Sequence, residues 1–238
     1  MEQTYNKTNS LKEGIISGFP IVIGYFPVAM AFGLLAKTID VSLMDSFLFS
    51  SMVFAGASQF MALELIRGGI SAGSIILATF LLNLRHMMMS ASLSIKLETG
   101  IKRKWLPLIA FGVTDETFSV ASLKNGQVTA SYVLALQGIS YSSWVSGTIT
   151  GYLAGSIIPV SLQNSLGIGL YAMFAAILVP EVKKSLNILF LSIGAGALYA
   201  VISYLKLFPG SWNLIATIMI SSIAGVVFLK DDSEEEKV

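Results

Sequence analysis

The sequence predicts an all-α fold: a polytopic membrane helix bundle of about seven or eight segments, with one or more broken or re-entrant helices. Hydrophobic residues make up 54% of the 238 residues and charged residues only 12%, whereas a soluble domain carries about 25% charged residues. The apolar residues form continuous runs near the length of about 20 that a membrane-spanning helix needs. Because these runs do not alternate with polar residues, they indicate helices and not barrel strands.

Four apolar runs precede residue 124. The first, 14–36, is long enough to cross a membrane. The second, 46–63, follows Asp45, a residue type that often caps the start of a helix. The third run, 70–95, follows a Gly-Gly pair, and the fourth is 105–123. Charged residues lie inside the third and fourth runs, which therefore differ from simple spans.

The second half of the chain is more uniformly apolar. No Asp, Glu, Lys or Arg occurs between Lys124 and Glu181, and Pro159 divides this stretch. The segments expected here and beyond are about 130–158, 166–179, 186–205 and 211–229. Because the intervening loops are too short for a soluble domain, we expect residues 1–238 to form one integral-membrane domain. The segments 1–12 and 231–238 are expected to be a polar N-terminal tail and a solvated C-terminal tail.

Basic residues constrain the orientation, because they favour the cytoplasmic side of a membrane. The basic sites are Lys7 with Lys12, the cluster 102–104, and the pair 183–184. If all eight runs cross completely, 102–104 lies on the side opposite the other two. The conflict disappears if one segment before 102–104 and one segment between 102–104 and 183–184 are re-entrant or broken. We expect the third and fourth runs, which contain charges, to be these segments.

Arg85 lies in the third run, in "NLRHMMMS" (83–90), and is the only charged residue between positions 67 and 96. An arginine at the centre of a membrane helix costs roughly 2.5 to 3.5 kcal/mol, so it needs a partner, water or a route to the interface. Alternatively, the span ends near residue 84 and 87–95 lies on the surface. Asn83 and His86 share a helix face. His86 fits either a hydrogen bond between helices or proton transfer.

Asp115 and Glu116 lie near the middle of the fourth run, shortly after Gly112. Together with Thr114 they form a typical helix start, with a capping hydroxyl group followed by acids where the helix dipole favours negative charge. A helix that begins in mid-membrane is discontinuous, and transporters place such breaks around their substrates. The alternatives are a loop with a short re-entrant stub, or a purely structural ion pair between Arg85 and Asp115.

The second run contains "FAGASQF" (54–60), in which Gly56 and its small neighbours permit close approach of a backbone or ligand. Ser58 and Gln59 supply polar groups there, although ordinary helix packing explains the pattern equally well. In the first run Pro27 removes a backbone donor and is expected to kink the helix or expose a carbonyl group. Helix breaks are therefore expected at Pro27, Gly56 and Gly112. A four-residue repeat that predicts a packing seam comprises Gly147, Gly151 and Gly155.

Several classes of function are excluded by composition. The chain has no cysteine, so it has no disulfide framework and no thiolate metal site. A net charge of +1 gives no basis for binding nucleic acid, and the lipid bilayer is the expected environment. No cofactor and no metal site is predicted.

Three strings, "FAGASQF", "NLRHMMMSASL" and "TDETFSV", occur in this order and spacing. In them the sequence resembles the AzlC family of branched-chain amino acid permeases, from about residue 14 through the last span. This resemblance implies a non-enzymatic membrane protein, the large subunit of a bacterial exporter of branched-chain amino acids and their analogues. It also implies a location in the cell membrane and a small multi-span partner subunit, AzlD.

The hypothesis that follows is a site for a zwitterionic amino acid near the membrane midplane. Its carboxylate is expected near Arg85 or a helix N-terminus, and its ammonium group near Asp115 or Glu116. Proton coupling through His86 or Glu116 is part of this hypothesis. Phe54, Phe60 or Met87 is expected to supply the surface for a leucine-like side chain. The residues predicted for substrate binding are Ser58, Gln59, Asn83, Arg85, His86, Asp115 and Glu116.

Other functions remain open at this point. Ser58 and His86 are a nucleophile and a base, as an intramembrane serine hydrolase requires. However, Gln59 stands where rhomboid-type enzymes have the second glycine of their serine motif, and the chain has no other histidine. A channel lacks support because no filter repeat is present. A scaffold subunit without its own pathway is the remaining alternative.

Overall fold

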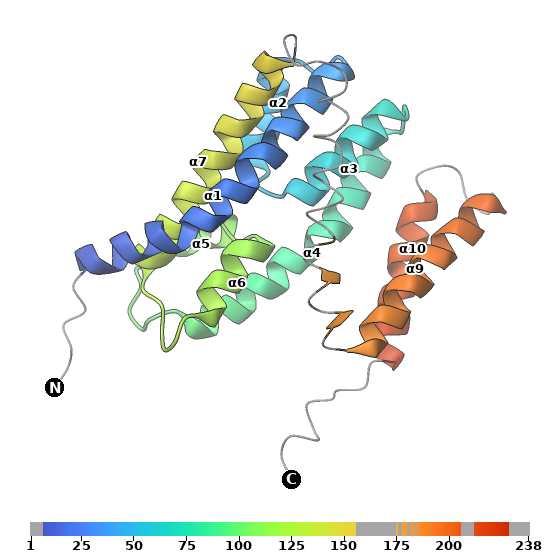
Figure 1. Ribbon diagram of the computed structural model, residues 1–238. Helices are drawn as coiled ribbons and strands as arrows, with labels where there is room; N and C mark the ends of the chain where they lie inside the picture. The colour runs from blue at the N-terminus through green and yellow to red at the C-terminus, as the bar shows by residue number, and fades with distance from the viewer. Residues whose placement is uncertain are drawn as a thin grey trace. The chain divides into compact units, whose positions relative to one another are not determined.

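The computed structural model describes residues 7–155, 185–205 and 212–228, together with five single positions between 175 and 183. The regular elements in these residues are helices, which confirms the all-α prediction (Figure 1). Contacts divide the chain into a first unit, Met1–Glu64 with Thr79–Leu170, and a second unit, Leu65–Ala78 with Tyr171–Val238. The predicted segment 166–179 lies almost wholly outside the described residues, and the tail 231–238 lies entirely outside them.

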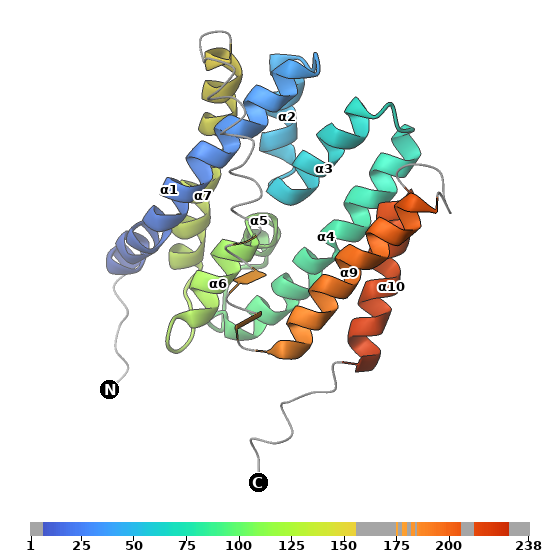
Figure 2. The same cartoon turned by 45° about the vertical axis from the view of Figure 1, so that its right-hand side comes forward.

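The scaffold of the first unit is a parallel pair of helices, α1 (Lys7–Thr38) and α7 (Ala130–Ala154), which lie side by side (Figures 1 and 2). Glycines allow this close approach: a Cβ atom on Gly33 would lie 2.0 Å from the Thr148 carbonyl oxygen, and one on Gly151 2.0 Å from that of Met30. The packing seam predicted at Gly147, Gly151 and Gly155 is thereby confirmed.

α1 is one continuous helix that contains both Pro20 and Pro27. The interruption predicted at Pro27 is therefore wrong, although this proline cannot donate a hydrogen bond to the Ile23 carbonyl group. Packing against α7 along the length of α1 holds the helix together across the missing bond. The helix begins at Lys7, inside the expected polar tail, and Ser10 is buried there against Thr129.

The second apolar run forms two helices, α2 (Leu43–Met52) and α3 (Gly56–Arg67), not the single span that was expected. The N-cap of α2 is Ser42, whose Oγ accepts a hydrogen bond of 3.1 Å from the Asp45 backbone N–H group. Asp45 therefore belongs to the first helical turn, and the prediction that it caps the helix is wrong. Residues 53–55, between the two helices, are not helical, so the break predicted at Gly56 is observed.

α3 changes direction after the interruption instead of extending α2 (Figure 2). The ring of Phe32 on α1 contacts Phe49 on α2, with a centroid distance of 6.2 Å, and Phe60 on α3, at 5.5 Å. In a continuous helix, residues 49 and 60 would be separated by about 16 Å. Since both reach the same ring, α2 and α3 form a hairpin around the interruption.

α4 (Ala72–Lys96) passes through the third apolar run without interruption. The alternative in which this helix ends near residue 84 is therefore not observed. The expectation that the charged third run is broken is also wrong, because the interruption before Lys102 lies in the second run. Arg85 does not disturb the helix, since its charge is satisfied by a partner from another element.

The fourth apolar run is interrupted as predicted. After the short 3-10 helix η1 (Arg103–Trp105), α5 (Leu106–Phe111) ends at Gly112, and α6 (Asp115–Leu123) begins after Thr114. Thr114 and Thr117 form a reciprocal capping box, in which each side chain accepts from the backbone N–H group of the other. The predicted N-cap followed by two acids is thus confirmed.

α5 and α6 also form a hairpin, and both of its outer ends lie at the N-terminal end of α7. Trp105 and Ala130 line the same groove. The Lys96 ammonium group at the end of α4 contacts the Ser122 carbonyl oxygen near the end of α6. The next residue, Leu97, pairs with Val128 just before α7. The hairpin therefore leaves this end of α7 and returns to it.

The same arrangement brings two of the basic sites to one end of the first unit. Lys102 and Lys104 line a groove together with Leu11, the neighbour of Lys12 in α1. The N-terminal end of α1 and the basic cluster 102–104 therefore lie at one end of the α1–α7 pair. In the sequence, the interrupted segment formed by α2 and α3 lies between them.

The second unit contains α9 (Leu186–Tyr204) and α10 (Trp212–Phe228), which pack against each other (Figure 1). Both match predicted segments. A pocket of about 450 Å³ lies between them, lined mainly by apolar and small residues such as Phe190, Gly194 and Ala224.

Three helical stretches in the described part of the chain are long and apolar enough to cross a membrane: Ser10–Thr38, Ala72–Lys96 and Leu186–Tyr204. Large apolar side chains are exposed on them, including Ile23 on α1 at 62% and Phe190 on α9 at 69%. Exposed apolar faces of this extent are typical of surfaces that meet lipid or another protein.

Candidate functional site

The two interrupted hairpins meet beside the middle of α7. Phe54 lies in the interruption between α2 and α3, and Phe111 is the last residue of α5; their ring centroids are 6.5 Å apart. Tyr141 on α7 contacts both rings, at 5.4 Å and 5.9 Å. Because each interruption frees backbone groups that a regular helix would pair, this meeting point concentrates polar backbone among aromatic rings.

Tyr25 on α1 joins the two interruptions and is 6% exposed. Its ring lies edge-on to Phe54 at 6.0 Å and to Trp144 at 5.2 Å. Its hydroxyl oxygen is 2.7 Å from Thr114 Oγ1 and also contacts Glu116 Oε2. A phenol has one proton, so with an ionised Glu116 it donates to the carboxylate and accepts from the Thr114 hydroxyl group. Sequence reasoning missed Tyr25, which has no local signature in its apolar run.

Arg85 and Asp115, predicted separately from two runs, form an ion pair. Arg85 Nη1 lies 2.7 Å from Asp115 Oδ2, and the two side chains are 34% and 27% exposed. Arg85 Nε is buried and has no hydrogen-bond partner within the described residues. Asp115 also lies in the first turn of α6, where the helix dipole favours its negative charge. The pair is therefore accessible on one side and retains an unused donor.

Gln59 is held by the protein itself. Its Nε2 donates to the Phe49 carbonyl oxygen, at 2.7 Å, and to that of Val53, so both amide protons are used. Its Oε1 accepts from Trp144 Nε1 at 2.9 Å. Because the two carbonyl groups lie at the end of α2, Gln59 fixes the shape of the first interruption. These three hydrogen bonds explain the position of Gln59 without the direct substrate contact that was predicted for it.

Ser58 and Asn83 form a second pair of predicted residues. Ser58 Oγ donates to the Ala55 carbonyl oxygen at 2.9 Å and accepts from Asn83 Nδ2 at 3.1 Å. Asn83 Oδ1 is buried without a hydrogen-bond partner in the part of the chain that the structure describes. Since Asn83 and Arg85 are separated by about 200° of helical rotation, they serve different sides of α4. The predicted single site is thus divided into two clusters.

His86 lies next to Arg85 on α4 and is half-buried. Among the described residues, the hydrogen-bond partners of Ser58 are Ala55 and Asn83, and His86 is not one of them. The nucleophile and base that a serine hydrolase requires are therefore not hydrogen-bonded to each other. Met87, considered as a surface for the substrate side chain, is 64% exposed, whereas Phe54 and Phe60 are each 4% exposed.

Gln137 on α7 supports the second interruption and was also missed. Its Nε2 donates to the Ile109 carbonyl oxygen at 2.9 Å. That carbonyl group lacks its regular helical donor, because the Val113 N–H group bonds to Ala110 instead. Gln137 is 4% exposed, and its Oε1 has no hydrogen-bond partner among the described residues. A Cβ atom on Gly112 would lie 2.5 Å from this oxygen, so a larger residue there would displace the Gln137 side chain.

The arrangement supplies opposite charges, unused polar atoms and aromatic surface in one unit. Arg85 Nε is an unused donor, whereas Asn83 Oδ1 and Gln137 Oε1 are unused acceptors. No group of three His, Cys, Asp or Glu residues able to hold a metal occurs in the described ranges. Arg85 and Asp115 are the groups that can pair with a ligand carrying both charges, whereas Asn83 belongs to the other cluster.

The chain matches a known protein family over the region that contains the site residues. The AzlC protein family profile matches residues 20–158, a range that contains every site residue described above. An uncharacterized membrane protein of Archaeoglobus fulgidus is 37% identical, over 75% of this chain and 78% of its own length. Inner membrane protein YgaZ of Escherichia coli is 32% identical, over 79% and 80%.

A third relative is the branched-chain amino acid transport protein AzlC of Bacillus subtilis, which is 25% identical over 75% of this chain and 72% of its own length. No solved structure matches the chain. The resemblance carried by the three sequence strings is therefore confirmed by the family profile and by relatives that cover most of the sequence. The chain belongs to the AzlC protein family of membrane proteins.

Proposed function

We propose that this protein is a membrane transporter for branched-chain amino acids and their analogues, and that substrate binds where the two interrupted hairpins meet. The observation that carries the proposal is the convergence of both interruptions on Tyr25, beside the half-exposed pair of Arg85 and Asp115. The name of the Bacillus subtilis relative supports the choice of substrate class.

The proposed topology is a bundle of about seven or eight segments in which α2–α3 and α5–α6 are re-entrant. The hairpins approach Tyr141 from opposite ends of α7: Ser50 on α2 shares a hydrogen bond of 2.7 Å with Thr148 toward one end, whereas α5 starts near Ala130 at the other. Re-entrant segments entering from opposite faces place their interruptions near the midplane. Residues 1–238 then act as one transport domain in a bacterial cell membrane.

The charges of the substrate explain why charged side chains lie within apolar runs of this chain. A bound zwitterion replaces the direct ion pair: its carboxylate accepts from Arg85, including the unused Nε, and its ammonium group contacts Asp115 or Glu116. Each ion in the sheltered site then has a partner of opposite charge. The branched aliphatic side chain packs against the aromatic cluster of Phe54, Phe111 and Tyr141, in which Phe111 is the exposed ring.

Further parts of the proposal concern coupling and assembly. Glu116, in contact with the Tyr25 hydroxyl group, and His86 are the groups assigned to proton coupling. Transport is in the direction of export, and the chain works as the large subunit with a small AzlD-like membrane partner. Lipid surrounds the exposed apolar faces of the spans.

The test is efflux of labelled leucine or valine from vesicles that contain the chain, with and without the small partner. Arg85→Gln and Asp115→Asn are each expected to lower the rate by at least about tenfold, the effect of losing one charge-assisted contact. Arg103→Gln, which removes an exposed charge from η1, serves as the matched control and is expected to retain the wild-type rate. Wild-type efflux by both site variants would contradict the proposed site.

A second measurement separates the carrier from the other functions considered. Saturable efflux supports a carrier, whereas a rate that rises linearly with substrate indicates a channel. Efflux only when the partner is present, with no binding to this chain alone, indicates a scaffold. Labelling of Ser58 by a fluorophosphonate would support the hydrolase, and Ser58→Ala is expected to transport normally.

A further inference from the structure

A groove of about 800 Å³ follows the N-terminal half of α7 in the first unit. One wall comes from α1, through Leu11 and Ile15, and α7 supplies Leu134 and Ile139. The groove is open at Gly138, where an added Cβ atom would meet nothing within 4 Å. Its mouth is formed by the loop that precedes α5. This groove is separate from the Arg85–Asp115 site, whose residues do not line it.

The length of the groove fits the inner or outer half of a membrane. Its lining on α7 extends from Ala130 to Ser142, which corresponds to about 18 Å of helix. One leaflet of a hydrocarbon core measures about 15 Å. A lipid chain whose headgroup lies at the mouth therefore finds an apolar wall through the depth of its leaflet.

The mouth is basic. Lys102 and Lys104 both line it, and the ammonium group of Lys104 lies 5.3 Å from the ring centroid of Trp105. Glu98 is the acidic residue of the lining, but its Oε1 accepts a hydrogen bond of 3.1 Å from the Ala130 N–H group, at the start of α7. Its negative charge is thus directed at a helix N-terminus, and the lysines remain available to an anion.

We propose that this groove binds an anionic phospholipid, with its phosphate group between Lys102 and Lys104 and one acyl chain along Leu134 and Ile139. Trp105 marks the depth of the headgroup, because tryptophan favours the membrane interface. The apolar walls select a lipid over a soluble phosphate, and the two lysines select an anionic headgroup over a neutral one. The site does not depend on which solute the protein transports.

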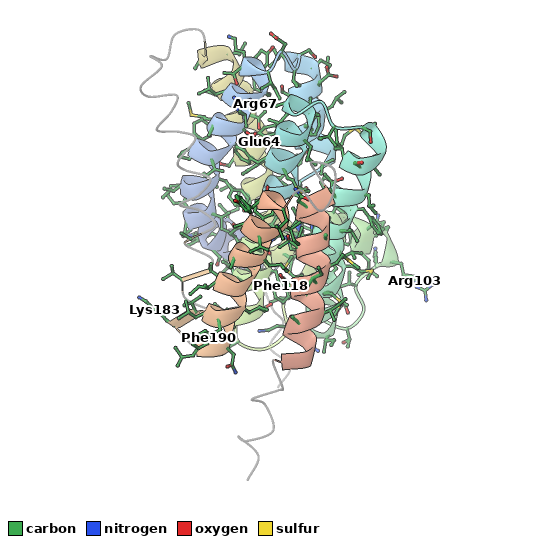
Figure 3. All side chains as sticks on the ribbon, turned by 90° about the vertical axis from the view of Figure 1, so that its right-hand side faces the viewer. Glu64, Arg67, Arg103, Phe118, Lys183 and Phe190 are labelled. Carbon is green, nitrogen blue, oxygen red and sulfur yellow. The ribbon has the colours of Figure 1, made fainter. Side chains whose placement is uncertain are left out.

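Arg103 offers a matched control. It lies between the two lysines in sequence but is not part of the groove, and its side chain extends away from the helices (Figure 3). Replacing Arg103 removes the same charge from the same loop without touching the site. A general attraction between the basic loop and an anionic membrane therefore responds to all three residues, whereas a built site responds only to the two lysines.

The experiment is a titration of the full chain, in neutral detergent, with phosphatidylglycerol, monitored by thermal unfolding. A ligand that binds the folded state raises Tm in a saturable way. Phosphatidylglycerol is expected to raise Tm, whereas phosphatidylcholine and inorganic phosphate at the same concentrations are not. Lys102→Gln with Lys104→Gln is expected to raise the half-saturating concentration by about 30-fold, since each basic side chain near an anionic lipid contributes roughly fivefold.

Two further variants complete the test. Arg103→Gln is expected to leave half-saturation within about twofold of wild type. Gly138→Leu places a side chain in the open part of the groove and is expected to weaken phosphatidylglycerol binding with both lysines present. The Tm without lipid shows whether each variant is folded. Equal stabilisation by phosphatidylcholine, an effect of inorganic phosphate alone, a loss in Arg103→Gln as large as in the double variant, or unchanged binding by Gly138→Leu would overturn the proposal.

Discussion

The hydroxyl group of Tyr25, in the middle of α1, contacts the carboxylate of Glu116 in the first turn of α6, 91 residues further along the chain. α1 is continuous at this point, whereas α6 has just begun. α1, which is uninterrupted, thus positions the first turn of α6, which follows the interruption at residues 112–114. The same tyrosine ring also contacts Phe54 in the other interruption, so one side chain couples both hairpins.

Removing the Tyr25 hydroxyl group tests this coupling. Tyr25→Phe keeps the ring contacts but leaves Thr114 and Glu116 without their partner, and hydrogen bonds to charged groups contribute about 1.5 to 3 kcal/mol. We expect leucine efflux to fall by at least about tenfold, with a free energy of unfolding lowered by no more than about 3 kcal/mol. The measurements are vesicle efflux and denaturant unfolding in detergent.

Tyr141→Phe is the control for this variant. The Tyr141 hydroxyl group lies in the same aromatic cluster but donates to the Ser51 carbonyl oxygen, at 2.9 Å, and not to an acid. Its loss is expected to cost about 1 kcal/mol of stability without changing the efflux rate. Equal loss of efflux in both variants would show that the aromatic cluster, and not the Glu116 contact, matters for transport.

The ion pair between Arg85 and Asp115 is expected to couple the stabilities of α4 and α6. Arg85→Gln and Asp115→Asn each leave a charge without its partner, which costs more than replacing both residues. In a double-mutant cycle, the double variant should lose less stability than the sum of the single losses, by about 0.5 to 2 kcal/mol. Strict additivity of the unfolding free energies would show that the two side chains do not interact in solution.

The close parallel packing of α1 and α7 predicts a sharp difference between two glycines of α1. A Cβ atom on Gly33 would meet the Thr148 carbonyl oxygen and, at 2.8 Å, the Tyr152 nitrogen, and backbone atoms cannot move aside easily. Gly33→Ala is expected to lower the free energy of unfolding by at least about 2 kcal/mol. Gly24→Ala, where nothing lies within 4 Å, is expected to be neutral or stabilising by up to about 1 kcal/mol. Similar effects at both positions would contradict the packing.

Gln59 is expected to be a structural residue of the first interruption. Gln59→Glu keeps the shape of the side chain but, when ionised, cannot donate to the carbonyl groups of Phe49 and Val53. Each buried group left unsatisfied costs about 1 to 3 kcal/mol, so the variant should unfold at a clearly lower temperature. Trp144→Phe removes the donor to Gln59 Oε1 together with part of a fully buried ring, so it is also expected to lower the unfolding temperature. A Gln59→Glu protein as stable as wild type would count against this role.

Features encoded locally were predictable from the sequence. The apolar runs at 186–205 and 211–229 correspond to α9 and α10 within one residue at each end. Thr114 with its two following acids predicted the start of α6, because a capping hydroxyl group acts on backbone groups only three residues away. The spacing of Gly147, Gly151 and Gly155 predicted a close helix contact for the same reason: it creates one small-residue face on a single helix.

Features that depend on the path of the chain were not predictable. The second apolar run contains no charge, yet it is interrupted, whereas the third run, with Arg85, continues as one helix. A charge inside a helix signals only that a partner is needed. Whether the chain breaks depends on what surrounds it: Asp115 satisfies Arg85, and Gln59, anchored by Trp144, stabilises the break at 53–55 by donating to carbonyl groups at the end of α2.

The sequence by itself determined that the chain is a membrane-embedded helical protein of this family and that its charged groups lie in two apolar runs, since hydrophobic length, helix capping and motif spacing are read from neighbouring residues. Only the tertiary structure decided that the second run is interrupted and the third is not, and that Tyr25, Trp144 and Gln137 hold the two interruptions. The physical reason is that these uncharged side chains acquire a role through hydrogen bonds to elements far away in sequence, which leave no local pattern.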